Sequence, residues 1–109
     1  MSYYAESTGT IYMKSGIEFH EDEIRDIEAT LEYFTIESYI ENNQQIFSLS
    51  SAKNFIEEEV RDDLMIFADD WHESTESGEI HFHGQDGEIW KYTFEDDRWI
   101  REEGFLEKK

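Results

Sequence analysis

The sequence predicts a two-layer α+β domain in which two helices pack on an antiparallel sheet. Two segments repeat apolar residues at helical spacing, and the remaining apolar residues stand in short alternating runs rich in Ile, Tyr, Phe and Thr. The last of these runs follow one another through short, turn-like connections, which favours antiparallel pairing of neighbours. With 109 residues and no proline, the chain is expected to form one domain over residues 1–109 without a linker.

The first strand and the first helix are predicted between residues 10 and 33. Residues 1–7 are expected to be a loose lead-in, and a strand is expected over Thr10–Lys14, up to the turn residues Ser15 and Gly16. A helix follows over Glu21–Tyr33, because the three acidic residues at its start suit a helix N-terminus. Its predicted buried face consists of Ile24, Ile27, Leu31 and Phe34.

A hairpin and the second helix come next. Strands over Thr35–Ile40 and Gln45–Leu49 flank a polar turn in which asparagine can adopt a positive φ. Ser50 or Ser51 is expected to cap the second helix. The clearest helical periodicity of the chain then defines the buried stripe of that helix, which consists of Ile56, Val60, Leu64, Phe67 and Trp71.

Three further strands are predicted after a polar break over His72–Gly78. They span Glu79–His83, Glu88–Phe94 and Arg98–Glu102. Alternation places Trp90, Tyr92 and Phe94 on one face of the sheet. The predicted order is therefore β-α-β-β-α-β-β-β, in which both helices can be buried against one antiparallel sheet.

Acidity is the most unusual property of the chain. Its 28 Asp and Glu against 9 Lys and Arg give a net charge of -19, which disfavours nucleic acid and anionic membranes as direct ligands and favours basic protein surfaces. The absence of cysteine excludes disulfides, and no apolar run approaches the roughly 20 residues that span a bilayer. A cytoplasmic protein is expected, and the sequence leaves its oligomeric state open.

The predicted binding surface is the solvent face of the second helix. Glu58, Asp62 and Asp69 point directly away from the apolar stripe, and the flanks are filled by Glu57, Glu59, Asp63 and Asp70. Carboxylates at i and i+4 lie about 6 Å apart along a helix axis, a spacing similar to that of phosphates along one nucleic-acid strand. The first helix and the turn with Asp96 and Asp97 add two more acidic patches. Trp99, next to that turn, is the predicted exposed anchor for a partner.

Metal binding and catalysis find little support in the sequence. His81 and His83 share one face of a strand, but no third ligand is fixed by spacing, and residues 69–74 lack the glycine of a calcium-binding EF-hand loop. The chain has no Gly-x-Ser-x-Gly, phosphate-binding glycine loop or His-Glu-x-x-His motif. Neither a metal nor a cofactor is expected, and the protein is not expected to be an enzyme.

In overall character the chain resembles the small acidic inhibitors of phages and mobile elements, notably anti-CRISPR proteins and antirestriction proteins that mimic DNA. The likeness is one of length, net charge and acidic runs, which are residues 57–59, 62–63, 69–70 and 96–97. It implies a stoichiometric inhibitor that occupies the PAM-reading or strand-binding groove of a CRISPR effector, or the DNA channel of a restriction enzyme.

The same acidity fits three alternative roles. An immunity protein or antitoxin that neutralises a basic nuclease toxin needs the same electrostatics. A non-inhibitory interaction domain could carry the charge for solubility alone. Adaptation to high salt is less consistent with the composition, because glutamate outnumbers aspartate 19 to 9.

Overall fold

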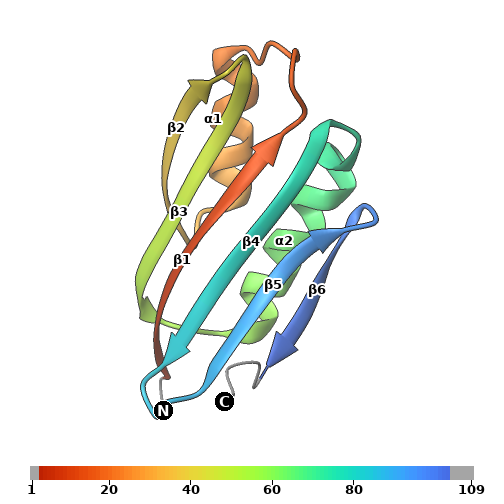
Figure 1. The fold of residues 1–109 in the computed structure, drawn as a ribbon. Coiled ribbons are helices and arrows are strands. Elements are labelled where there is room, and N and C mark those ends of the chain that lie inside the picture. The colour runs from red at the N-terminus through yellow and green to blue at the C-terminus, as the bar shows by residue number, and fades with distance from the viewer. Residues whose placement is uncertain (1–2, 104–109) are drawn as a thin grey trace.

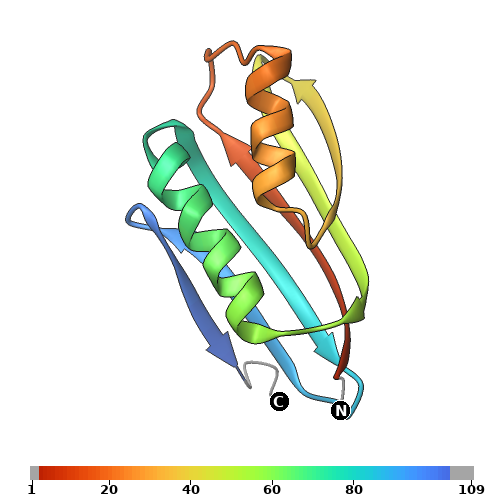
Figure 2. The same cartoon turned by 180° about the vertical axis from the view of Figure 1, so that it is seen from behind.

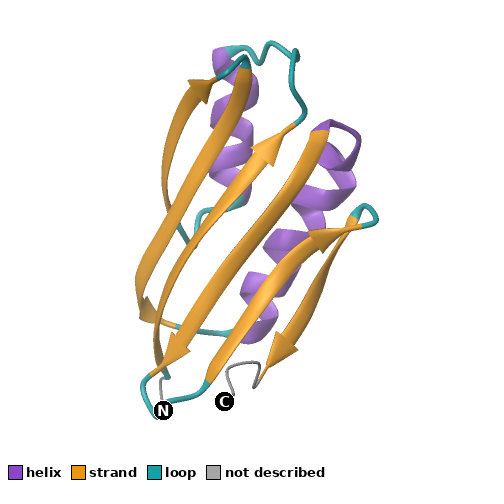
Figure 3. Cartoon of the chain, viewed as in Figure 1, coloured by secondary structure: helices purple, strands orange, loops and turns teal. Residues whose placement is uncertain are grey.

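The computed structural model describes residues 3–103 and confirms the predicted α+β class, with two helices and a six-stranded antiparallel sheet in the expected order. Figure 3 shows the helices in a layer of their own behind the sheet. The elements are β1 (Tyr4–Met13), α1 (Glu21–Thr30), β2 (Thr35–Glu41), β3 (Gln44–Asn54), α2 (Glu57–Trp71), the 3-10 turn η1 (His72–Ser74), β4 (Thr75–Gly84), β5 (Ile89–Glu95) and β6 (Arg98–Glu103).

The strand order across the sheet is β2-β3-β1-β4-β5-β6, so β1 lies in the middle between β3 and β4. Both helices cover the same face. α1 lies behind the half of the sheet that contains β2 and β3, and α2 lies behind the half that contains β4, β5 and β6 (Figures 1 and 2). In the described part of the chain, the opposite face of the sheet carries no helix. The protein therefore presents one helical surface and one open sheet surface.

The core lies between these layers and is rich in aromatic side chains. Val60, Leu64 and Phe67 of α2 are buried, as the helical periodicity predicts. Trp90, Tyr92 and Phe94 are also buried on one face, as strand alternation predicts. The rings of Phe82 and Trp90 stack with centroids 5.3 Å apart at an interplanar angle of 3°.

The central strand begins earlier than the sequence predicts. β1 starts at Tyr4, so most of the predicted lead-in is regular strand. Ala5 and Ser7 are buried because they lie on the face of β1 that the helices cover, where Ser7 is opposite the buried Phe82. Pairing with β3 on one side and β4 on the other satisfies the backbone groups of this segment, although it contains no long apolar run.

The prediction that Ser50 or Ser51 caps the second helix is wrong. β3 continues to Asn54, and the Ser51 hydroxyl lies 2.6 Å from that of Ser7 across the sheet. α2 begins at Glu57 after an N-cap at Ile56, which is 53 % exposed and so does not belong to the buried stripe.

Two further boundaries differ from the prediction. α1 ends at Thr30 because Leu31 leaves helical geometry, with φ -99° and ψ 43°. The predicted polar break over 72–78 is instead η1 and the beginning of β4. Thr75 is buried there, and its hydroxyl donates to the Trp71 carbonyl oxygen at 2.7 Å, which holds the start of β4 against the end of α2.

The two tightest hairpins use asparagine and aspartate at positive φ. Asn42 and Asn43 have φ of 53° and 63°, and Asp96 and Asp97 have φ of 54° and 66°. Two consecutive residues at positive φ match the right-handed twist of the flanking strands. Among residues 3–103, neither helix has the length and apolarity needed to cross a membrane.

Candidate functional site

The helical surface gathers acidic residues that belong to two separate patches of the sequence. α1 carries five carboxylates and one arginine, and α2 carries seven carboxylates and one arginine. Both helices cover the same face of the sheet (Figure 2), so their exposed side chains belong to one surface. We call the solvent-facing side of α1 and α2 the acidic face.

On α2 five of the seven predicted carboxylates are exposed, whereas Glu57 and Asp63 are partly buried, and the surface has one addition that the sequence prediction missed. The exposed carboxylates are those of Glu58, Glu59, Asp62, Asp69 and Asp70. Between them lie Met65 and Ile66, whose side chains are 56 % and 50 % exposed. Both residues fall outside the spacing of the buried stripe, so that the same periodicity could have revealed them. The surface is therefore acidic with an apolar centre.

A groove of about 490 Å³ lies beside the first turns of α2. Four carboxylates line it together with Tyr33, Lys53 and Asn54; they are Glu32, Glu59, Asp62 and Asp63. Partial burial of Asp63, together with the negative charges of Glu32, Glu59 and Asp62, raises the pKa of its carboxyl group. Lys53 lies 4.6 Å from the centre of the Tyr33 ring. A cationic side chain from a partner would relieve the repulsion in this groove.

Glu57, a predicted partner-binding residue, points inward. Its carboxylate accepts hydrogen bonds from the Tyr92 hydroxyl and from Arg101 Nε, the latter at 2.9 Å. Burial of Tyr92 and its hydrogen bond to Glu57 raise the pKa of the Tyr92 hydroxyl above its ordinary value. Glu57 therefore joins α2 to the sheet and is only partly exposed, unlike the five exposed carboxylates of α2.

The prediction of Trp99 as an exposed anchor is wrong. Its ring packs against Phe94 at 5.4 Å and Phe67 at 6.4 Å between ring centroids, and its indole nitrogen is buried. Asp96 and Asp97 are exposed at the tip of the β5–β6 hairpin, which lies beside the C-terminal end of α2 (Figures 1 and 2). These two aspartates therefore form an exposed acidic turn beside α2, whereas the ring of Trp99 packs into the core next to them.

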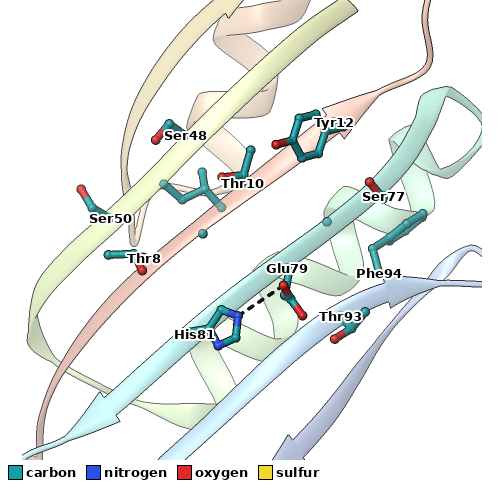
Figure 4. Close-up of a pocket in the computed structure, with 13 residues that line it drawn as sticks. Thr8, Thr10, Tyr12, Ser48, Ser50, Ser77, Glu79, His81, Thr93 and Phe94 are labelled. Atoms are coloured by element: carbon teal, nitrogen blue, oxygen red, sulfur yellow. Dashed lines mark ion pairs between the residues drawn. The ribbon is translucent and has the colours of Figure 1, made fainter.

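The open sheet surface has a different chemistry. A trough of about 640 Å³ crosses β3, β1 and β4, and Figure 4 shows the hydroxyl-bearing side chains along it. They include Thr8, Thr10, Ser48, Ser50 and Ser77.

At one side of the trough Glu79 binds His81 and Lys91, each at 3.3 Å. Although partial burial opposes it, these contacts hold the pKa of Glu79 below its ordinary value. His81 and His83 share this open face, as alternation predicts. Within residues 3–103, no three acidic or histidine side chains converge in a way that could hold a metal ion.

Comparison of the chain with protein-family models, with curated proteins and with solved structures finds no match. The acidic face and the open sheet surface are therefore the features from which a function can be inferred.

Proposed function

We propose that the protein is a stoichiometric inhibitor that binds the basic nucleic-acid-binding surface of a DNA- or RNA-processing enzyme, such as a CRISPR effector. The supporting observation is the distribution of charge over the helices, where one arginine in each helix stands against five and seven carboxylates. A surface of this kind attracts lysine- and arginine-lined grooves over long range and accelerates association. Such an inhibitor would act in the cytoplasm of a bacterial cell.

The arrangement of the exposed carboxylates supports a phosphate-like role. Glu58 and Asp62 are one helical turn apart, about 6 Å along the axis, and Asp69 continues the same row two turns later. Their positions are fixed by the helix, whose buried side packs on the sheet. A partner's basic residues would therefore meet negative charges in a preformed row, with little ordering of backbone on binding.

The apolar centre of the acidic face favours a protein as the partner. Met65 and Ile66 would contact an apolar part of the partner's groove, while the surrounding carboxylates pair with its basic residues. Interface energy is commonly concentrated in a few desolvated side chains inside a polar rim. This arrangement fits a CRISPR effector, a restriction enzyme or a nuclease toxin, and the last of these would make the protein an immunity protein.

The test is a binding assay on a defined panel: a purified CRISPR effector with its guide RNA, a restriction endonuclease and a nuclease toxin domain. We expect tight 1:1 binding to one of them, competition by its nucleic acid, and weaker binding as salt is raised. Substitution of Glu58, Asp62 and Asp69 by Lys should slow association strongly.

The matched control reverses the same number of charges on the open sheet surface, at Glu6, Glu37 and Glu41, which are exposed there. That triple variant should bind nearly as well as the unmodified protein. Equal loss of binding in both triple variants would show that net charge alone acts, and binding that ignores both salt and the helix substitutions would exclude the mimicry mechanism.

A further inference from the structure

β2 forms one edge of the sheet, and β3 is its only strand neighbour in the described part of the chain. One row of backbone N–H and C=O groups on such a strand has no partner in the sheet, which makes an edge strand a template for pairing with another chain. The strand spans Thr35–Glu41 and contains two isoleucines, a tyrosine and a threonine, residue types that favour extended structure. β2 is thus suited to accept another strand.

The side chains of β2 leave an apolar surface at this edge. Ile40 is 71 % exposed, the largest exposure of a large apolar side chain within residues 3–103, and Tyr39 is 44 % exposed. Ile40 lines a notch of about 470 Å³ with two other apolar residues, Ile17 and Phe19, and with five polar or charged ones, and Ile17 is itself 38 % exposed. The apolar surface therefore extends beyond a single residue, at the end of a strand whose outer edge is open.

We propose that β2 pairs antiparallel with β2 of a second copy of this chain, with the two-fold axis at Ser38. In this register Ile36 lies directly opposite Ile40 of the second copy, on the helix side of a continuous twelve-stranded sheet. Glu37 lies opposite Tyr39 of the second copy on the open side. The pairing would cover the most exposed isoleucine with another isoleucine, twice by symmetry.

Charge selects this register over its neighbours. A two-fold axis at Glu37 would place that glutamate opposite its own copy, and an axis at Tyr39 would place Glu37 opposite Glu41 of the second copy. Like charges directly opposite on neighbouring strands are destabilising. The axis at Ser38 leaves no carboxylate opposite another along the strand.

The sign of the salt dependence separates this association from the proposed inhibitor function. Two chains of net charge -19 repel each other, so that salt should strengthen the dimer by screening that repulsion. Binding to a basic partner through the acidic face should instead weaken with salt. The two proposals can therefore fail independently.

The absence of cysteine from the chain makes a register-specific test possible. In the proposed dimer, Ser38→Cys places two cysteines opposite each other with Cα atoms about 4.5–5.5 Å apart, a distance that a disulfide can bridge. Tyr39→Cys places them diagonally, about 7–8 Å apart, which is too far. Ser50→Cys, at an exposed position of the inner strand β3, is the matched control.

Under mild oxidation Ser38→Cys should form a disulfide-linked dimer at least about tenfold faster than either of the other variants. Equal rates for the three variants would overturn the register. Circular dichroism of each variant checks the fold, because the Ser38 hydroxyl also donates to Glu28 at 2.7 Å.

Sedimentation equilibrium of the unmodified chain gives an independent measurement. Self-association should be detectable between about 10 µM and about 1 mM and should increase with salt, and Ile40→Lys should weaken it at least about tenfold. Ile56→Lys makes the same charge change at another half-exposed isoleucine and should leave association unchanged. A chain that remains monomeric at the highest protein and salt concentrations would overturn the proposal.

Discussion

Glu57 in the first turn of α2 accepts a hydrogen bond from Arg101 Nε of β6 at 2.9 Å, and the Tyr92 hydroxyl of β5 donates to the same carboxylate oxygen. One carboxylate therefore connects the start of a helix to two strands. A negative charge at a helix N-terminus is also favourable for the helix dipole. In a chain with this excess of acid, Glu57 is a carboxylate whose charge stabilises the fold.

Glu57→Ala should destabilise the protein by about 1–3 kcal/mol, because the buried Tyr92 hydroxyl would lose its acceptor and Arg101 an ion-pair partner. Glu58→Ala removes an exposed carboxylate one residue later and should change stability by less than about 0.5 kcal/mol. Urea denaturation of both variants measures the difference. Equal stabilities would mean that the contacts of Glu57 contribute nothing net.

Tyr92 should make the free energy of unfolding fall with rising pH in the alkaline range. Its pKa in the folded protein is raised above the ordinary value by burial and by the Glu57 hydrogen bond, so that its stabilising contribution is present below about pH 10 and lost as pH rises further. Tyr92→Phe should be less stable at neutral pH but should show a shallower fall in the free energy of unfolding above pH 10. Denaturation curves measured from neutral pH to pH 11 compare the two slopes, and parallel slopes would contradict the assignment.

Asp63 lowers the stability of the fold at neutral pH, whereas Tyr92 raises it, because the neighbours of Asp63 in the groove are negatively charged. Its folded pKa is raised, so its ionised form destabilises the fold at neutral pH, and that cost disappears once the pH falls below the ordinary carboxyl range. Asp63→Asn should therefore raise the melting temperature by about 2–4 °C at pH 7 and low salt, from relief of roughly 0.5 kcal/mol of like-charge repulsion.

The gain from Asp63→Asn should shrink with added salt and vanish at acid pH. Asp69→Asn provides the control at an exposed position near the far end of α2. An equal gain from both variants would mean that the effect comes from overall charge and not from the groove.

Local patterns were enough to predict the class, the order of elements and most of the core. The stripe Val60, Leu64 and Phe67 and the alternation of Trp90, Tyr92 and Phe94 both appear as expected, because burial on one side of a helix or strand leaves its period in the sequence. The hairpin turns were also recognisable, since Asn and Asp tolerate positive φ. Boundaries determined by pairing between distant segments were not.

Two errors have this long-range origin. The start of β1 and the end of β3 stabilise each other across the sheet, as Ser7 and Ser51 show, and neither segment carries a strong strand pattern of its own. The sequence does not distinguish Glu57 from the exposed glutamates that follow it, because its partners Tyr92 and Arg101 come from distant strands. The error at Trp99 is local instead: Trp99 lies opposite Phe94 in the predicted hairpin, and this pairing places it on the buried face of the sheet with Phe94.

At Gly9 the backbone of β4 leaves no room for a side chain on β1, which provides a stringent test of the register of these two strands. A Cβ atom at this position would lie 2.5 Å from the Glu79 carbonyl oxygen and 2.7 Å from Ile80 Cα, and both are backbone atoms of β4 that cannot rotate away. Gly9→Ala must therefore push β1 and β4 apart in the middle of the sheet, and we expect a loss of about 3 kcal/mol or more. Thr8→Ala, at the adjacent exposed position on the open face, should cost less than about 0.5 kcal/mol. If urea denaturation shows Gly9→Ala to be as stable as Thr8→Ala, the β1–β4 register is incorrect. A shift of one residue between the two strands would make room for the methyl group. The same shift would exchange the residues that face the helices for those that face solvent.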